Sequence, residues 1–340
     1  MAKKILVSGA CGYIGSHTLV DLIEKGFEVI SVDNLSRGNI KTLEGIKKIT
    51  GTEVDNYLVD LCDIDATRQI FKENTDIEGI IHFAAYKTVP ESVKYPLKYF
   101  KNNLNSLLNL LECAQEFQVE NFVFSSSCSV YGNVTKLPVD ESNPLGEAEC
   151  AYARTKQMGE QILADFGKAN PNIKQIALRY FNPVGAHESA LLGEYAEQPE
   201  NLVPVITQTA IGRRKSMQVH GTDYNTRDGS CIRDYIHVMD IADAHTKALE
   251  YLQTGKNKAQ FEIFNLGTGN GVSVLEAIKA FEKLSGQKLN YTTGPRRAGD
   301  VEAIYADNKK AAELLNWKAK RGIEEMMDSA WRWEQNLKKQ

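Results

Sequence analysis

The residues best suited to chemistry are a tyrosine and a lysine four positions apart, Tyr152 and Lys156, preceded by a serine run that ends at Ser127. On a helix, residues four apart lie on the same face, about one turn from each other. A phenol ordinarily has a pKa of about 10, so it is a poor base at neutral pH unless nearby positive charges stabilise the phenolate. Lys156 supplies one such charge, and a positively charged cofactor would supply another. We therefore expect Tyr152, Lys156 and Ser127 to form a proton-transfer site.

The Tyr-x-x-x-Lys pattern alone is weak, because the chain has 14 tyrosines and a second match at Tyr305 and Lys309. Tyr152 differs in its context, since Ser127 precedes it at the end of an apolar run and a long helical pattern begins at the tyrosine. Tyr305 has no serine partner of this kind. A buried structural tyrosine is the alternative for Tyr152, and the combination of serine, strand and helix favours the catalytic interpretation.

Three glycines near the N-terminus predict a nucleotide site. Gly9, Gly12 and Gly15 follow the apolar run 5–7 and precede an amphipathic segment. Glycines at this spacing let the backbone approach a pyrophosphate, whose charge is met by the helix N-terminus. A strand-to-helix turn without a ligand is the alternative interpretation.

Asp33 supports the nucleotide interpretation, because it ends the next apolar run. A carboxylate at that place accepts hydrogen bonds from both ribose hydroxyls and repels a 2′-phosphate. A turn that simply starts at Asp33 is the alternative. Together with the glycines, Asp33 favours NAD over NADP, and an oxidised nicotinamide would be the positively charged cofactor beside the tyrosine.

Short apolar runs that alternate with longer amphipathic segments would position these residues. The runs occupy 5–7, 29–32, 57–59, 80–83 and 122–124, and helical patterns cover 96–117 and 152–166. This alternation predicts an α/β fold, a Rossmann-type doubly wound parallel sheet.

The second half of the chain has a looser pattern. Prolines and glycines become frequent after Tyr180, so we expect loops and short elements there, without a repeat or a long linker. We predict an NAD-binding Rossmann domain over 1–180. Residues 181–340 would form mainly a smaller C-terminal substrate-binding lobe at the carboxyl edge of the sheet, with some segments returning to the Rossmann domain.

Composition and charge narrow the class of protein. The 340 residues carry a formal net charge of −4, which gives no overall attraction to nucleic acid. The cysteines form no CxxC pair and the histidines show no metal-ligand spacing, so we expect reduced thiols, a cytoplasmic location and no metal. The apolar run at the N-terminus is too short for a signal peptide, and no apolar stretch reaches the ~20 residues of a membrane-spanning helix.

Two arginines are candidates for binding phosphate. Arg233 and Arg297 each stand among aspartates and loop glycines, whereas the run 213–215 is typical of a solvated charged surface. On residue type alone, a binding role and a surface role are equally supported for both arginines.

With these motifs in place, the chain resembles the extended short-chain dehydrogenase/reductase family, and within it the enzymes that invert UDP-hexoses at C4. The resemblance runs nearly end to end. It rests on the strings at 12–18 (GYIGSHT), 33–35 (DNL), 124–127 (FSSS), 178–187 (LRYFNPVGAH) and 233–240 (RDYIHVMD).

The resemblance implies an activity and an assembly. The activity would be reversible epimerisation of UDP-galactose and UDP-glucose through a transient 4-keto sugar, with tightly bound NAD. Tyr152 would take the proton of the sugar 4-hydroxyl, and Ser127 would hydrogen-bond the same oxygen. The assembly would be a homodimer in which the helices at 96–117 and 152–166 of each subunit pair as a four-helix bundle.

Binding roles also follow from the resemblance, position by position. Besides the three glycines, it places around the cofactor Tyr13, Ile14, Asp33, Asn34, Leu35, Ser36, Arg37, Gly38, Asp60, Leu61, Phe83, Ala84, Ala85, Tyr86, Lys87, Asn102, Ser127, Tyr152, Lys156 and Phe181. It places around the UDP-sugar Lys87, Ser127, Tyr152, Asn182, Asn201, Leu202, Gln218, Val219, His220, Arg233, Arg297, Ala298, Gly299, Asp300 and Ile304. Arg233 and Arg297 would clamp the diphosphate.

The chain departs from the family pattern at four places. Ser8 replaces a threonine but keeps its hydroxyl, and 153–155 is bulkier than the Gly-Lys-Ser common between the tyrosine and lysine. His220 takes a place that is often aromatic. Ile304 is intermediate in size between the tyrosine that restricts some members to unacetylated sugars and the small residue that admits N-acetyl groups. The specificity for N-acetylated sugars therefore stays open.

Two other functions compete with epimerisation. A nucleotide-sugar dehydratase or decarboxylase of the same fold would need a further acid/base pair, and dehydratases typically carry Thr-Asp-Glu near Ser127, where this chain has Cys128 and Ser129. A regulator that binds NAD without chemistry would have no need of the Tyr152 and Lys156 pair.

Overall fold

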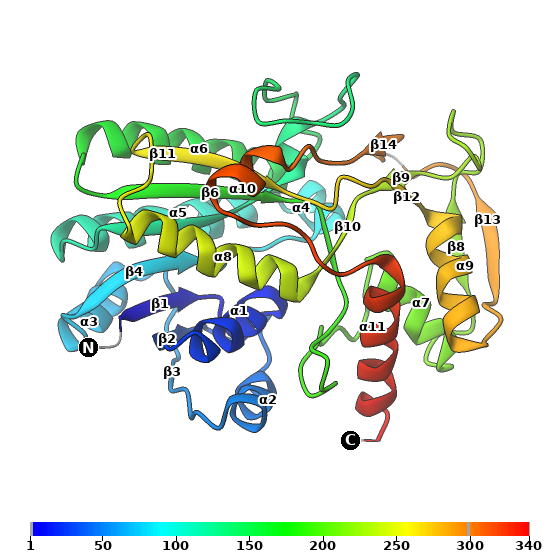
Figure 1. The fold of residues 1–340 in the computed structure, drawn as a ribbon, viewed down its shortest axis with the longest axis horizontal. Coiled ribbons are helices and arrows are strands. Elements are labelled where there is room, and N and C mark those ends of the chain that lie inside the picture. Colours follow the sequence, from blue (N-terminus) through cyan, green and yellow to red (C-terminus); the bar gives the residue numbers. More distant parts are fainter. Residues whose placement is uncertain (1–2, 298–299, 340) are drawn as a thin grey trace.

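The structure, a computed structural model, describes residues 3–297 and 300–339. Its central element is a parallel sheet of seven strands in the order β11-β6-β5-β4-β1-β2-β3 (Figure 1). The strand order reverses between β4 and β1, which is where doubly wound sheets bind ligands. The strands are β1 (Lys4–Ser8), β2 (Glu28–Val32), β3 (Asn56–Tyr57), β4 (Ile77–His82), β5 (Asn121–Ser127), β6 (Lys174–Tyr180) and β11 (Phe261–Leu266).

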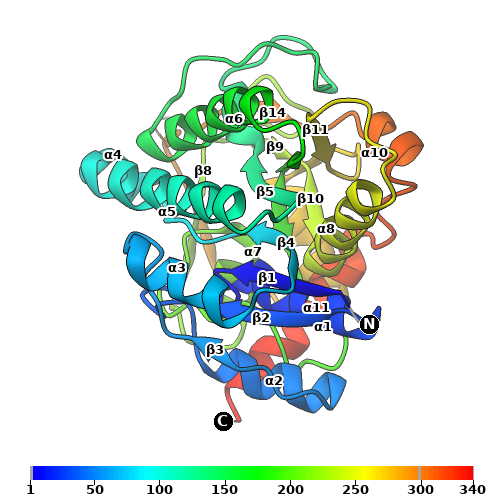
Figure 2. The same ribbon diagram turned by 90° about the vertical axis from the view of Figure 1, so that its left-hand side faces the viewer.

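Helices cover both faces of the sheet (Figure 2). One face carries α1 (Tyr13–Glu24), α2 (Lys41–Thr50) and α8 (Val238–Gln253), and the other carries α3 (Ile64–Glu73), α5 (Pro96–Glu116) and α6 (Ala151–Ala169). Successive side chains of a strand point to opposite faces, so each strand supplies two cores. In β1, for example, Ile5 and Val7 belong to the core under α1 and α8, and Leu6 belongs to the core under α5 and α6.

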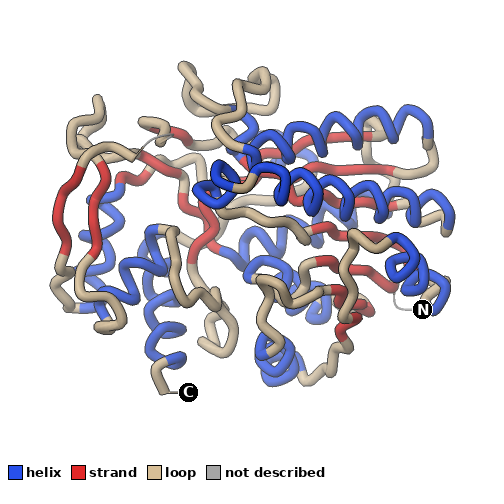
Figure 3. The backbone as a smooth tube through the Cα atoms, turned by 180° about the vertical axis from the view of Figure 1, so that it is seen from behind, coloured by secondary structure: helices blue, strands red, loops and turns tan. Residues whose placement is uncertain are grey.

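A smaller lobe lies beyond the carboxyl ends of the strands (Figures 1 and 3). Phe281 and Met327 belong to its separate apolar core. The lobe contains the helices α7 (Leu202–Ala210), α9 (Val274–Ser285) and α11 (Ile323–Leu337), and the short strands β7 (Asn182–Val184), β8 (Met217–His220), β9 (Ile232–Arg233), β10 (Tyr235–His237), β12 (Val272–Ser273), β13 (Tyr291–Gly294) and β14 (Ala303–Ile304). The remaining elements are η1 (Cys128–Tyr131), α4 (Val89–Lys94) and α10 (Lys309–Leu314).

The five predicted strands and the two predicted long helices are confirmed, but the expectation of loops and short elements after Tyr180 is wrong. The helices α8, α9 and α11 are 16, 12 and 15 residues long. The frequent glycines and prolines lie mostly between these elements, whereas the helices bury apolar faces. Because α8 and β11 pack in the sheet domain, the chain returns to it after the lobe begins. The division at residue 180 stays a prediction.

Crossing a membrane would require a helix that is both long and apolar. Within residues 3–297 and 300–339, no helix combines the two properties to the extent required.

A buried ion pair joins α6 to β6. Arg179 donates to the two carboxylate oxygens of Glu160 at 2.8 and 2.5 Å, and the Ser126 hydroxyl donates to the same carboxylate at 2.5 Å. Both charged side chains are only 3% exposed, and the guanidinium lies 4.8 Å from the centroid of the Tyr131 ring. A buried charge is tolerated when its partner and its hydrogen bonds are present, and it is costly when either is lost.

We predict that Arg179→Met lowers the free energy of unfolding by ~3 to 5 kcal/mol, because it leaves the Glu160 carboxylate buried without a cation. Urea unfolding followed by circular dichroism would measure the loss. Arg68→Met is the matched control, since Arg68 pairs with Asp65, Glu112 and Glu116 at the surface and should lose far less stability. Equal losses in the two variants would contradict the prediction.

Candidate active site

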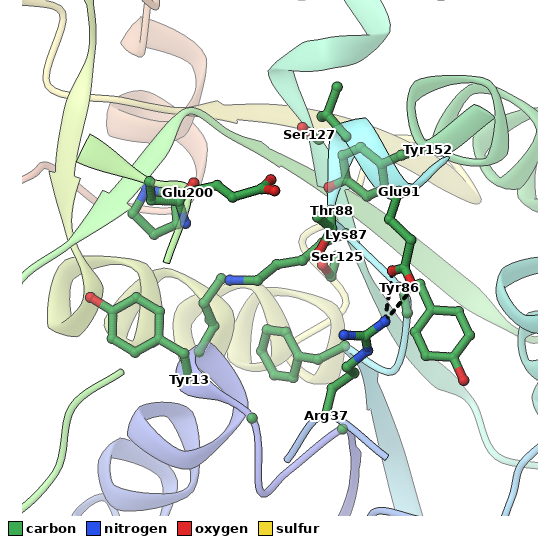
Figure 4. A pocket seen from close by; sticks show the side chains of 18 of the residues that line it. Tyr13, Arg37, Tyr86, Lys87, Thr88, Glu91, Ser125, Ser127, Tyr152 and Glu200 are labelled. Atoms are coloured by element: carbon green, nitrogen blue, oxygen red, sulfur yellow. Dashed lines mark hydrogen bonds and ion pairs between the residues drawn. The ribbon is translucent and has the colours of Figure 1, made fainter. Parts of the chain in front are cut away.

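A cavity of about 1210 Å³ lies between the sheet and the lobe. Residues that follow β1, β2, β4, β5 and β6 line one side, so the cavity is at the carboxyl ends of the strands. Figure 4 shows Ser125, Ser127 and Tyr152 on one wall, with Tyr13 and Arg37 on the side of the glycine loop. The cavity therefore includes the strand-order reversal, as expected for a doubly wound sheet.

The glycine loop connects β1 to α1 at the floor of this cavity. Gly9 has a φ of +67°, and a Cβ there would lie 2.7 Å from the backbone nitrogen of Ala84. A Cβ at Gly15 would collide with the Gly9 carbonyl oxygen and lie 2.9 Å from the Cα of Ala10. Gly12 is the N-cap of α1 and has no side chain to bond the first helical amides. Those amides remain available to an anion such as a pyrophosphate.

Asp33 is buried at the end of β2, beside the glycine loop. Its carboxylate accepts hydrogen bonds from the backbone nitrogens of Cys11, at 3.0 Å, and Leu35, at 2.8 Å. Burial raises the pKa of this carboxyl, and the two backbone hydrogen bonds act in the opposite direction. Arg37 is paired with Glu91, at 2.7 and 2.6 Å, so its charge is already met (Figure 4). A carboxylate whose neighbouring cation is already paired favours NAD over NADP.

Tyr152 lies in the first turn of α6 and Lys156 lies one turn later. The Lys156 ammonium is 6.0 Å from the centroid of the Tyr152 ring and 4.7 Å from that of Phe124. It donates to the backbone carbonyl of Ser125 at 2.5 Å. Ser127 ends β5 and accepts a hydrogen bond from the backbone nitrogen of Ser129 at 3.2 Å. The structure therefore brings the three predicted catalytic residues to one wall of the cavity.

The charges at this wall are set mainly by burial. Burial raises the pKa of the Tyr152 phenol well above its ordinary value, whereas a hydrogen bond with Ser127 lowers it. Burial also lowers the pKa of the Lys156 ammonium to about 7, and the Glu160 carboxylate opposes that change. Because Lys156 is itself desolvated, the protein groups alone do not favour the phenolate. A second positive charge at this wall, such as an oxidised nicotinamide, would favour the phenolate.

Two arginines face the lobe side of the cavity and share one carboxylate. Arg297 donates to Asp300 at 2.9 Å, and Arg233 approaches the same carboxylate oxygen at 3.7 Å. Arg233 also donates to the backbone carbonyl of Ile232 at 2.9 Å. Two guanidinium groups against one carboxylate leave donors for a diphosphate.

Most residues that the sequence assigned to binding line this one cavity. From the assigned cofactor residues, the lining contains Gly9, Gly12, Tyr13, Ile14, Gly15, Asp33, Asn34, Ser36, Arg37, Gly38, Asp60, Leu61, Phe83, Ala84, Ala85, Tyr86, Lys87, Asn102, Ser127, Tyr152, Lys156 and Phe181. From the remaining substrate residues it contains Asn182, Asn201, Arg233, Arg297, Asp300 and Ile304. The roles of these residues stay predictions.

Some assigned residues do not line the cavity. Leu35 contributes its backbone nitrogen to Asp33, and Leu202 packs against the lobe core as the first residue of α7. In β8, Val219 is buried in that core, so the neighbouring side chains of Gln218 and His220 point to the other face and are exposed. Ala298 and Gly299 lie outside the described residues.

A segment of which sequence reasoning indicated only Asn201 closes the lobe side of the cavity. All of its residues, 193–201, line the cavity, and Figure 4 shows Glu200 opposite Tyr152. Glu194 pairs with Lys87 at 3.2 Å, which connects the segment to the sheet domain across the cavity. The Glu194 carbonyl also accepts a hydrogen bond from the Trp333 indole at 3.1 Å. These contacts join residues far apart in the chain, so no local pattern could have indicated them.

The chain is similar to proteins of one family along nearly its whole length. Residues 6–330 match the family described as GDP-mannose 4,6 dehydratase. A UDP-glucose 4-epimerase of Bacillus subtilis (strain 168) is 47% identical over 331 residues, which cover 97% of this chain and 96% of that protein. A UDP-glucose 4-epimerase of Erwinia amylovora is 46% identical over 332 residues, with 97% of each chain covered.

Solved structures agree with these relatives. The UDP-glucose 4-epimerase of Stenotrophomonas maltophila, with bound NAD and formylated UDP-arabinopyranose, superposes with a TM-score of 0.95 at 41% identity and covers 99% of each chain. The enzyme of Bifidobacterium longum, in complex with NAD+ and UDP, superposes with a TM-score of 0.94 at 44% identity and covers 98% of each chain.

We predict that Gly15→Ala abolishes retention of NAD, with a fall of at least ~10-fold in nucleotide content, because the new Cβ would displace the Gly9 carbonyl that shapes the loop. Nucleotide released by acid from the purified protein would be quantified per chain. Gly322→Ala is the control, since Gly322 is the N-cap of α11 with a φ of −87°, and a Cβ there would meet no described atom within 4 Å. Full NAD content in the Gly15 variant would refute the assignment of the loop.

Proposed function

The chain belongs to the UDP-glucose 4-epimerases of the extended short-chain dehydrogenase/reductase family, and from this we propose that it interconverts UDP-galactose and UDP-glucose with tightly bound NAD. The reaction inverts C4 through a transient 4-keto sugar, and it serves galactose metabolism and the supply of UDP-hexoses. The observation that carries the proposal is the single cavity that holds the glycine loop, the Tyr152 wall and the paired arginines.

The residues around the glycine loop fit NAD. Gly12 leaves the first amides of α1 without a side-chain partner, so they can bind a pyrophosphate, and Asp33 offers a carboxylate to a ribose. A bound NAD would supply the acceptor for the hydride of C4 and, once reduced, the donor that returns it. Tight retention is expected, because loss of the reduced cofactor in mid-cycle would strand the keto sugar.

The chain's own residues move and hold the proton. In our proposal, the Tyr152 phenolate takes the proton of the 4-hydroxyl and Ser127 donates a hydrogen bond to the same oxygen. Lys156 stabilises the phenolate by its charge. Tyr152 later returns the proton to the oxygen of the keto sugar when the alcohol forms again.

Inversion requires that the sugar turn over while the nucleotide stays in place. Arg233 and Arg297 would hold the diphosphate, since both line the lobe side of the cavity and present guanidinium donors. The hexose would be held more loosely, so the 4-keto sugar presents its other face to the same wall.

Dehydration is the competing chemistry, because the matching family model is described by a dehydratase. Removal of a C5 proton needs another acid/base pair beside Ser127. Cys128 and Ser129 stand there instead, and burial raises the pKa of the Cys128 thiol to about 12, which keeps it neutral. This neutral thiol favours epimerisation.

The range of sugars depends on Ile304. Its side chain is 4% exposed and packs in an apolar cluster with Phe181 and Val130 at the cavity edge. Incubation of the protein with UDP-N-acetylgalactosamine, followed by chromatography of the nucleotide sugars, would show whether this cluster leaves room for an acetamido group.

The finer proposals concern location and assembly. We place the enzyme in the cytoplasm, supported by its six cysteines, all of which are free thiols.

We also propose a homodimer through α5 and α6. Its support is an exposed apolar row, with Leu97 at 70% and Leu108 at 46% exposure, three helical turns apart on one face of α5.

We predict that the purified protein converts UDP-galactose to UDP-glucose without added NAD, and that Tyr152→Phe lowers kcat by at least ~100-fold because it removes the base. Chromatography of the nucleotide sugars measures the conversion, and released NAD shows that the variant still holds its cofactor. Absence of conversion by the wild-type protein even with added NAD would refute the function. Near-normal turnover by the variant would refute the role of Tyr152.

We predict that Leu97→Glu combined with Leu108→Glu converts the dimer to a monomer, since two carboxylates would be buried unpaired in the apolar interface. Light scattering after size exclusion gives the mass. Leu58→Glu is the control, because Leu58 is 68% exposed and lies outside α5 and α6. A monomeric wild-type protein, or a double variant that stays dimeric, would refute the proposed interface.

A further inference from the structure

A buried carboxylate lies one helical turn after Lys156 but outside the cavity. Glu160 stands four residues after Lys156 on α6, so the two side chains share one face of the helix. Glu160 is not among the residues that line the cavity. Any effect that it has on the reaction must therefore pass through another residue.

The groups around Lys156, Ser125 and Glu160 come from four elements. On α6 these are Tyr152 and Glu160, and on β5 they are the Ser125 carbonyl at 2.5 Å and the Phe124 ring at 4.7 Å. On β4 the buried imidazole of His82 has its pKa lowered to about 3 by burial and by Lys156, so it is neutral. On β6 the Tyr180 hydroxyl bonds the Ser125 hydroxyl, and Arg179 faces Glu160. Among these groups, Glu160 is the one whose charge raises the pKa of Lys156.

The Glu160 carboxylate is fixed in place by its own partners. Arg179 binds both oxygens, at 2.8 and 2.5 Å, and the Ser126 hydroxyl adds a third donor at 2.5 Å. Ser126 stands between Ser125, which receives the Lys156 ammonium, and Ser127 at the cavity wall. One strand therefore positions the carboxylate and the ammonium together.

We propose that Glu160, held by Arg179 and Ser126, is a positioning residue that keeps Lys156 protonated and so keeps Tyr152 able to act as the base. A negative charge acts strongly on a neighbour in a site shielded from water, where there is little solvent to screen it. Without that charge the desolvated lysine loses its proton at lower pH. The phenolate of Tyr152 then loses its cationic neighbour. The inference rests on the proposed role of Tyr152.

The test is a titration of Tyr152 in the NAD-loaded protein, which needs no turnover. Tyrosinate absorbs in the near ultraviolet where the phenol does not, and subtraction of the matching Tyr152→Phe protein isolates the signal of this residue. In Glu160→Gln we expect the phenolate to appear at a pH higher by about one unit or more than in the wild type. The same variant should lose at least ~10-fold in kcat, with the alkaline limb of its pH profile moved to lower pH.

Two further variants separate charge from structure. Glu160→Asp keeps the negative charge on a shorter side chain, so its Tyr152 titration should stay close to that of the wild type even if stability falls. Glu160→Leu combined with Arg179→Met removes both charges and leaves no buried ion unpaired. Its titration should fall between those of the wild type and Glu160→Gln, and it decides the question if Glu160→Gln does not fold.

The outcomes are distinguishable from those for the function as a whole. An unmoved Tyr152 titration in Glu160→Gln and in the double variant would overturn the proposal, as would an equal displacement in Glu160→Asp. So would the absence of any phenolate signal below the ordinary pKa of tyrosine in the wild type. A protein that titrates as expected but does not convert UDP-galactose would refute the proposed reaction and leave the positioning role of Glu160 in place.

Discussion

The burial of a lysine ammonium at the end of β5 is the constraint on which the rest of the structure depends. A cation taken out of water is costly unless carbonyls, aromatic faces or anions replace the lost solvent. Lys156 has a carbonyl in Ser125 and an aromatic face in Phe124, and the Glu160 carboxylate stands one helical turn away on the same face of α6. These groups are held in place only if α6 packs against β5 in one register. The ion pair between Glu160 and Arg179 then extends that requirement to β6.

The same logic explains why the cavity needs both halves of the molecule. The sheet supplies a glycine loop, a ribose carboxylate and the tyrosine wall, all at the ends of its strands. The sheet domain contributes few groups that could bind the diphosphate of the second nucleotide, that of the UDP-sugar. The paired arginines come from the lobe, and the segment 193–201 connects the lobe to the sheet domain through the contact of Glu194 with Lys87. This division suits the proposed reaction, because the lobe can hold the nucleotide firmly while the sugar stays free to turn beside the tyrosine wall of the sheet domain.

The parts of the site that sequence could predict are those with a local pattern. Gly9, Gly12 and Gly15 were recognisable because a strand, a turn and a helix follow one another within a few residues. The pair Tyr152 and Lys156 was recognisable because a helical turn brings them together. The spacing of Glu160 from Lys156 was equally visible, but its burial depends on Arg179 from another strand, and no local pattern contains that information. The lobe was harder for the same reason, because its helices α9 and α11 meet each other only in the folded chain. Because glycines and prolines are frequent in the connections, the sequence pattern suggested loops where the structure has helices of ordinary length.

The place of β11 in the sheet has a consequence for synthesis of the chain. β6 pairs with β5 on one side and with β11 on the other, and β11 spans only Phe261–Leu266. A nascent chain that has already emerged as far as β6 therefore presents an apolar strand edge to solvent while most of the lobe is still being translated. Such an edge can pair with other chains. We therefore expect the yield of native enzyme to depend on how well this edge is protected on the ribosome, by a chaperone or by rapid translation.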